Sequence, residues 1–221
     1  MSLKVLLLNC TLKKSSELSN TGTLLNKVKN LMLEEDSKLD VSEIQITDYS
    51  VYFGTTSDEK EGDEWPLILN KILNCDILII GTPVHSGLIT SITQMVLERL
   101  SGTLSDELTE KAQVLLYGKV AGIVACGSED GVHAAGKILS FRLINFGCLV
   151  PPNAYCYWVG GISNEDKSYL GNKGDKNYMV NRCALLLAHS TIYMAKLLKK
   201  HPIPIDFNEI DHQARRICDK D

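Results

Sequence analysis

The sequence has no long hydrophobic run, no basic stripe and no targeting segment. Its opening apolar run, residues 3–8, is too short for the core of a signal peptide with its flanks and far too short to span a bilayer. The formal net charge is −4, whereas proteins that bind nucleic acid usually carry a positive balance or a clear basic patch. We therefore expect a cytoplasmic protein that binds neither nucleic acid nor a membrane.

The cysteines and histidines form no metal-binding pattern, so no metal is expected. The seven cysteines show neither C-x-x-C nor paired metal-ligand spacing, and the five histidines are scattered along the chain. Reduced thiols in a reducing compartment explain this usage. The sequence also lacks G-x-x-x-x-G-K-[ST] and G-x-G-x-x-G, which disfavours a P-loop nucleotidase and a dinucleotide fold that uses the glycine fingerprint.

What is present is an alternation of apolar runs and helical stripes. Runs of strand length recur at residues 3–9, 76–81, 119–126 and 148–157, with a weaker alternating strand near 41–47. Stripes of helical period lie at 24–32, 67–73, 95–100, 134–144 and 178–198. This alternation predicts a doubly wound α/β fold, and the number of elements matches a flavodoxin-like five-stranded parallel sheet with helices on both faces.

The chain is expected to form one large domain followed by a tail. Its 221 residues, of which 44% are hydrophobic, suit a single core that buries about 70% of the unfolded surface without disulfides. Residues 1–198 form the predicted domain, and 48–64 and 159–177 are predicted to be polar loops within it. Residues 199–221 contain two prolines and then a short charged segment. We expect this tail to pack on the domain or on a partner subunit.

The loop after the first predicted strand is rich in hydroxyl groups. It reads NCTLKKSSELSNT, residues 9–21, and ligands of open α/β sheets bind outside the carboxyl ends of the strands. The next helix begins near residues 19–21, where free N–H groups and the helix dipole favour an anion. Lys13 or Lys14 would offset the charge of a phosphate. The alternative is a plain capped loop, because Ser, Asn and Thr are also the preferred N-caps.

Two more loops fall at the same edge of the predicted sheet. GTPVHSG, residues 81–87, combines Pro83, which fixes an extended backbone, with Gly87, which lets a flat ligand approach the chain. In CGSEDGVHAAG, residues 126–136, two glycines bracket a short polar turn before a helix. Each loop taken alone is also compatible with an ordinary helix entrance. Their shared edge favours a common binding role.

The three loops together resemble the NADPH-dependent FMN reductases and related flavodoxin-like oxidoreductases. The first loop is similar to the family's N-G-S-P-R and G-N-T pattern, with Thr11 at the serine, Lys13 at the arginine and residues 19–21 at G-N-T. GTPVHSG is similar to the family's T-P-x-Y-x-G flavin loop, and CGSEDGVH stands where the family has a glycine-containing loop. The resemblance covers residues 3 to 198.

The sequence departs from the family pattern at three positions. Cys10 replaces a glycine, Lys13 an arginine and His85 the usual tyrosine. Lysine keeps the positive charge of arginine but loses its forked hydrogen-bonding geometry. A histidine still presents a flat ring for stacking, so these departures alter the details of the expected site and leave its outline.

The resemblance implies that FMN binds with its phosphate on residues 11–21 and its ring between the loops at 82–87 and 127–131. NADPH or NADH would pass a hydride to flavin N5, and a small acceptor such as a quinone or free flavin would follow. A homodimer or homotetramer is also implied. The expected FMN-binding residues are Thr11, Lys13, Ser19, Asn20, Thr21, Thr82, Pro83, Val84, His85, Ser86, Gly87, Cys126, Gly127, Ser128 and Gly131.

Four more side chains are candidates for the substrate side of this site. His85 and His133 are the nearest histidines, and either is a candidate proton donor, although hydrogen-bonded structural histidines are commoner. Tyr155 and Trp158 follow the fifth strand and are candidates for the wall of a substrate cavity with 159–177 as a lid. The alternative for the two aromatic residues is a core cluster under a surface loop.

Two other functions stay open on the sequence. A flavodoxin-like electron carrier would bind FMN without turning over a small substrate, and a non-catalytic module of the same fold would hold another phosphorylated ligand or none. A yellow purified protein would support flavin binding. Consumption of NAD(P)H with a quinone acceptor would then separate an enzyme from a carrier.

Overall fold

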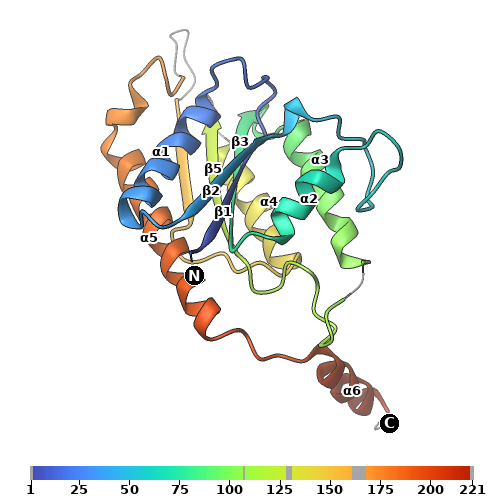
Figure 1. The fold of residues 1–221 in the computed structure, drawn as a ribbon. Coiled ribbons are helices and arrows are strands. Elements are labelled where there is room, and N and C mark those ends of the chain that lie inside the picture. Colours follow the sequence, from blue (N-terminus) through green and yellow to red (C-terminus); the bar gives the residue numbers. More distant parts are fainter. Residues whose placement is uncertain (1, 107, 128–130, 161–167, 220–221) are drawn as a thin grey trace.

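A five-stranded parallel sheet forms the centre of the computed structural model, which describes residues 2–106, 108–127, 131–160 and 168–219 (Figure 1). The strands, in the order β2-β1-β3-β5-β6, are β2 (Asp40–Gln45), β1 (Lys4–Asn9), β3 (Ile77–His85), β5 (Val120–Gly127) and β6 (Tyr155–Val159). A two-residue strand, β4 (Leu88–Ile89), pairs antiparallel with the end of β3. This strand order is that of a flavodoxin-like sheet, so the predicted fold class is confirmed.

Helices cover both faces of the sheet (Figure 1). One face carries α1 (Asn20–Glu35) and α5 (Tyr178–Lys200), and the other carries α2 (Trp65–Leu73), α3 (Ser91–Leu100) and α4 (Val132–Asn145). Side chains alternate along a strand, so Leu6 and Leu8 of β1 pack toward the second group while Val5 and Leu7 pack toward the first. Burial on both faces explains the near-continuous apolar runs of these strands.

The prediction of a strand over 148–157 is wrong in its first half. Regular pairing with β5 begins at Tyr155, and Leu149 before it makes an isolated bridge to Val120. The reason lies in the residues between, since Pro151 and Pro152 offer no N–H to a ladder. Asn153, with φ of 61°, then turns the chain into β6.

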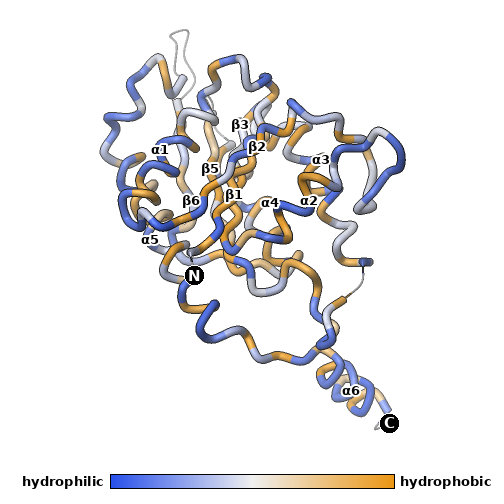
Figure 2. The backbone as a smooth tube through the Cα atoms, viewed as in Figure 1, coloured by the Kyte–Doolittle hydropathy of each residue, from blue (hydrophilic) through white to orange (hydrophobic). Residues whose placement is uncertain are grey.

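The C-terminal tail forms a helix, α6 (Phe207–Cys218), that extends away from the sheet (Figure 1). Its first residue is attached to a preceding loop: the Phe207 N–H donates to the Lys111 carbonyl over 2.9 Å, and its ring meets Tyr117 edge-on at 5.1 Å. Residues 208–219 are exposed, and Figure 2 shows hydrophobic and hydrophilic positions along the helix. None of the described helices is both long and apolar enough to span a bilayer.

Candidate functional site

A cavity of about 350 Å³ lies where β1, β3 and β5 end. This volume is within the usual range of small-molecule pockets. Its lining comes from all three predicted loops and from the segment before α5. The lining residues are Thr11, Leu12, Lys13, Ser19, Asn20, Thr21, Pro83, Val84, Cys126, Gly127, Ser168 and Tyr169. Nine of the residues predicted from the sequence are thus gathered around one cavity.

The N-terminus of α1 forms the polar end of this cavity. Ser19 is the N-cap, and its hydroxyl accepts a hydrogen bond from the Gly22 N–H over 2.9 Å. The N–H groups of Asn20 and Thr21, in the first turn, have no acceptor within the helix, and the positive end of the helix dipole lies here. Thr11 and Thr21, residues that are 4% and 2% exposed, add two hydroxyl groups. The arrangement is suited to an anion.

Lys13 supplies positive charge beside this helix end. Its ammonium group donates to the Leu18 carbonyl over 2.9 Å, and its own carbonyl accepts hydrogen bonds from the side chains of Gln45, over 2.6 Å, and Thr47. Lys14 turns elsewhere, and its ammonium group donates to the Thr47 carbonyl. Lys13, which the family resemblance named as the FMN-binding lysine, lines the cavity, and Lys14 does not.

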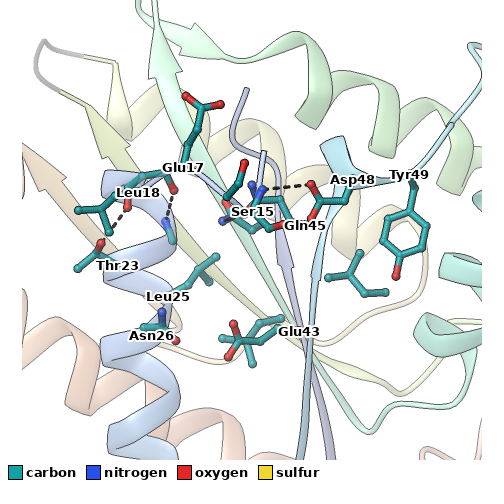
Figure 3. A pocket seen from close by; sticks show the side chains of 16 residues that line it. Ser15, Glu17, Leu18, Thr23, Leu25, Asn26, Glu43, Gln45, Asp48 and Tyr49 are labelled. Atoms are coloured by element: carbon teal, nitrogen blue, oxygen red, sulfur yellow. Dashed lines mark hydrogen bonds between the residues drawn. The ribbon is translucent and has the colours of Figure 1, made fainter. Parts of the chain in front are cut away.

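A larger cavity of about 820 Å³ borders the same loop, but its lining disfavours an anion (Figure 3). It contains the carboxylates of Glu17, Glu43 and Asp48. Ser15, whose side chain Figure 3 shows beside Asp48, donates its N–H to that carboxylate over 3.1 Å. Hydrogen bonds from Ser15 lower the pKa of Asp48, which favours its ionised form. A phosphate would meet like charges here, so the smaller cavity is the candidate anion site.

The second and third predicted loops touch each other at the cavity's outer side. After β3 the chain turns back into β4 through Ser86 and Gly87, whose φ values of 51° and 77° are both positive, as in a type I′ hairpin. Gly131, with φ of 123°, stands against this turn, because a Cβ added to it would lie 2.5 Å from the Gly87 Cα and carbonyl oxygen. The two loops therefore form one continuous wall.

Six of the fifteen predicted FMN-binding residues are not among those that line the cavity. His85, Ser86, Gly87 and Gly131 belong to the hairpin and the loop end beside it and are outside the lining. Thr82 is fully buried, and its hydroxyl is 2.7 Å from the Thr93 hydroxyl, so it supports the loop from below. Ser128 lies outside the described residues.

Both candidate proton donors are exposed and lie outside the cavity lining. His85 pairs with Leu88 at the hairpin. His133 is in the first turn of α4, where its ring meets Tyr157 edge-on at 5.0 Å. A role for either in proton transfer stays a prediction.

Tyr155 and Trp158 point to opposite faces of β6, as an odd spacing in a strand requires. The Tyr155 hydroxyl donates to the Val132 carbonyl, and burial raises its pKa. Trp158 meets the ring of Tyr169 edge-on at 5.8 Å. The two predicted substrate-cavity residues thus do not lie on the same wall. Trp158 does not line the smaller cavity itself, but it packs against Tyr169, which does.

Tyr169 is a cavity residue that sequence reasoning missed. It is 1% exposed, and its hydroxyl has no hydrogen-bond partner within the described part of the chain. Its ring packs on Gly174, where an added Cβ would come within 2.1 Å of the Tyr169 Cδ2. A single aromatic residue in a polar loop gives no periodic signal, so the sequence did not single it out.

The cavity thiol is an inert wall residue. Burial raises the pKa of Cys126 to about 12, so the thiol is neutral near pH 7. Cys10, beneath the first loop, has a pKa of about 12 through burial, partly offset by a hydrogen bond with Thr93. Among the residues that the structure describes, no group of three or more His, Cys, Asp or Glu side chains is placed to hold a metal ion.

Comparisons with known proteins agree with this geometry. The model of the NADPH-dependent FMN reductase family matches residues 3–160. An 8-demethyl-8-aminoriboflavin-5'-phosphate synthase from Streptomyces davaonensis is 35% identical over 99% of this chain and 87% of that protein. The crystal structure of RosB with the bound intermediate 8-demethyl-8-formylriboflavin-5'-phosphate is 32% identical, with a TM-score of 0.89 over 100% of this chain and 89% of that one.

A more distant structure supports the fold alone. An NADH:FMN oxidoreductase in its apo form (EMOB) is 17% identical, with a TM-score of 0.60 over 91% of this chain and 92% of that one. The two relatives named above at 35% and 32% identity, the synthase and RosB, are both flavin-related enzymes. Because the family model covers more than half of the sequence and includes all three loops, the chain belongs to the NADPH-dependent FMN reductase family.

Proposed function

We propose that the protein binds FMN in the smaller cavity and transfers a hydride from NADPH or NADH, through the flavin, to a small acceptor such as a quinone or free flavin. The observation that carries this proposal is the joint lining of one cavity by the α1 N-terminus, Lys13 and the ends of β3 and β5. We further propose that the protein acts in the cytoplasm, which the thiol usage supports.

The residues around the cavity fit a phosphorylated flavin. The N–H groups of Asn20 and Thr21, the Thr11 and Thr21 hydroxyls and the Lys13 ammonium group supply hydrogen-bond donors and charge for a phosphate. The apolar side chains of Pro83 and Val84 border the path from this end toward the hairpin wall. The chain thus offers polar donors for a dianion and apolar side chains for a ring.

Bound flavin would supply the redox chemistry, while the protein positions it and tunes its surroundings. Gly127 and Gly131 bring the end of β5 and the start of α4 to the cavity wall, and the positive end of the α4 dipole there favours negative charge nearby. The neutral Cys126 thiol is not required as a nucleophile. His85 and His133, both in contact with solvent, remain the proposed proton donors.

A flavin titration followed by a turnover assay tests the proposal. FMN should bind at least about ten-fold more tightly than riboflavin, a difference of about 1.4 kcal/mol, because riboflavin lacks the phosphate. The same sample should then oxidise NADPH or NADH when a quinone is added. Refusal of added FMN would refute the proposed site, and flavin binding without turnover of any acceptor would support an electron carrier instead.

A second candidate function is chemical modification of the flavin itself. The relative at 35% identity is named for the synthesis of a modified riboflavin phosphate, and the RosB structure holds a modified flavin. Mass spectrometry of the flavin recovered after incubation separates the two functions. An unchanged flavin mass after many turnovers supports hydride transfer, whereas a change in mass confined to the ring supports modification.

A further inference from the structure

The hydroxyl of Tyr169 has no hydrogen-bond partner within the described part of the chain, although the residue is buried in the wall of a cavity. Tyr169 is 1% exposed and lines the smaller cavity. A buried polar group without a partner costs free energy, and the large majority of such groups in folded proteins are paired. An unpaired hydroxyl on a residue of the cavity wall therefore indicates that its partner is a bound ligand.

The ring of Tyr169 is held in place by its neighbours. It meets Trp158 edge-on at 5.8 Å, and it packs so closely on Gly174 that a Cβ added there would come within 2.1 Å of its Cδ2. The Gly174 N–H also donates to the Tyr169 carbonyl over 2.8 Å. The ring therefore has little freedom to turn its hydroxyl toward another partner within the protein.

The segment that carries Tyr169 is attached to helix α1, whose N-terminus forms the polar end of the cavity. The Leu170 N–H donates to the side-chain oxygen of Asn20 over 2.9 Å, and the Lys27 ammonium group donates to the Asp175 carbonyl over 3.0 Å. Asn20 thus holds this segment with its side chain, while its own N–H has no acceptor within the helix. The attachment places Tyr169 beside the donors proposed for the phosphate.

We propose that the Tyr169 hydroxyl donates a hydrogen bond to an oxygen atom of the ribityl phosphate chain of FMN. This inference rests on the proposed binding of FMN, and it adds a donor from the segment before α5, which none of the three predicted loops includes. Burial raises the pKa of the Tyr169 hydroxyl, so the group keeps its proton near pH 7 and acts as a donor. Ribityl and phosphate oxygens both accept from such a group, and the bond to a charged phosphate is the stronger.

Removal of this hydroxyl alone tests the proposal. Tyr169→Phe keeps the ring and its packing, so we expect the dissociation constant for FMN to rise about ten-fold through the loss of one hydrogen bond. Lumiflavin, which has the flavin ring without the ribityl chain, should bind equally well to the variant and the wild type. Riboflavin separates the two kinds of oxygen: an unchanged affinity assigns the bond to the phosphate, and a lower affinity assigns it to the ribityl chain.

The stability of the protein without flavin gives a second readout. Because the Tyr169 hydroxyl has no partner in the described chain, Tyr169→Phe should leave the free energy of unfolding unchanged or slightly higher. Tyr155→Phe is the matched control: the Tyr155 hydroxyl donates to the Val132 carbonyl, so its removal should lower the free energy of unfolding. Urea unfolding of both variants without flavin measures the difference.

Three outcomes would overturn this inference alone while the wild-type chain still binds FMN. An unchanged affinity of Tyr169→Phe for FMN, or an equal loss of affinity for lumiflavin, would mean that the hydroxyl does not contact the chain of the flavin. A loss of stability in Tyr169→Phe as large as that in Tyr155→Phe would mean that the hydroxyl has its partner within the protein. Failure of the wild-type chain to bind FMN would instead refute the proposed function together with this inference.

Discussion

Lys13 and Lys14 are neighbours in the chain, but only Lys13 lines the smaller cavity, so substitutions of the two can be compared directly. We predict that Lys13→Gln raises the dissociation constant for FMN about ten-fold, because the cavity loses its positive charge, and leaves riboflavin binding nearly unchanged. Lys14→Gln should change neither, since the Lys14 ammonium group contacts the Thr47 carbonyl outside the smaller cavity. Fluorescence titration with both flavins measures the effect. Equal losses in the two variants would point to general electrostatics and away from a phosphate site.

Gly131 has a positive φ and also lies close to the backbone of Gly87. Gly118 has a positive φ without a close neighbour, so it separates the effect of backbone strain from that of the contact. We predict that Gly131→Ala lowers the affinity for FMN several-fold, because its Cβ would collide with Gly87 and push the two loops apart. Gly118 has a similar positive φ of 80° but nothing within 4 Å of an added Cβ. Gly118→Ala should therefore cost about 1 kcal/mol of stability through backbone strain and leave FMN binding intact. Titration and thermal unfolding of both variants check this.

The sequence predicted the three loops better than it predicted the positions of single side chains. Residue type and chain order are enough to locate the loops, and nine of the predicted residues line one cavity. The resemblance named Lys13 and not Lys14, but the sequence did not reveal how the loop is held, with the Lys13 carbonyl accepting hydrogen bonds from the side chains of Gln45 and Thr47. Tyr169 became visible through its packing on Gly174 and Trp158, contacts that no local pattern encodes.

A buried ion pair fastens the loop between η1 (Ile46–Asp48) and α2 to helix α3. The Arg99 side chain, fully buried, donates to the Asp63 carboxylate over 2.6 Å and to the carbonyls of Thr56 and Tyr52 over 2.9 and 2.8 Å. The guanidinium carbon also lies 5.5 Å from the centre of the Trp65 ring. One side chain thus donates to three acceptors of this loop, a carboxylate and two backbone carbonyls.

We predict that Arg99→Leu destabilises the protein by about 3 to 5 kcal/mol, because it leaves the Asp63 carboxylate buried without its partner. Arg142→Leu is the matched control: Arg142 is partly buried, donates to the Leu97 carbonyl over 3.4 Å and stacks on Phe146, and it forms no ion pair with any residue that the structure describes. Its loss should be markedly smaller. Urea unfolding measures the free energy of unfolding of both variants. Equal decreases would mean that the buried arginine stem stabilises the protein and that the ion pair contributes nothing more.

Elements were predicted well where periodicity and burial agree. The helices α1 to α5 and the four strands β1, β2, β3 and β5 coincide with predicted segments to within a few residues, because each buries a stripe or a face that the sequence displays. The error at 148–157 arose where apolar character continued while Pro151 and Pro152 removed the hydrogen-bonding capacity of a strand. β4 is set by two positive φ angles at Ser86 and Gly87, which hydrophobic patterning does not report.

For the whole molecule, Asp63 gives a pH dependence of stability. Burial raises the pKa of its carboxyl. Hydrogen bonds from Arg99 and from the N–H groups of Glu59, Trp65 and Tyr52 lower the pKa by more than burial raises it, to a net value of about 2. The pKa in the unfolded chain is about 3.9. The folded state therefore favours the ionised form, and its contribution is complete above about pH 4 and lost as the pH falls toward about 2.

We predict that the wild-type protein loses stability on the order of 2 kcal/mol between about pH 4 and about pH 2 through this group. The Asp63→Asn variant cannot form the ion pair with Arg99, so it should be less stable than the wild type near pH 7. Its free energy of unfolding should also change less between about pH 4 and about pH 2. Urea unfolding at a series of pH values measures the slope. An unchanged slope in the variant would assign the acid sensitivity to other carboxylates.

The cysteine side chains differ in exposure between the domain and its C-terminal helix. The cysteines under the sheet edge and in the strands are buried, Cys183 is half-buried, and Cys218 at the tip of α6 is exposed. A maleimide dye at low stoichiometry should therefore react first at Cys218, far from the cavity at the ends of β1, β3 and β5. Such a fluorophore would report on the tail in the intact protein without altering that cavity.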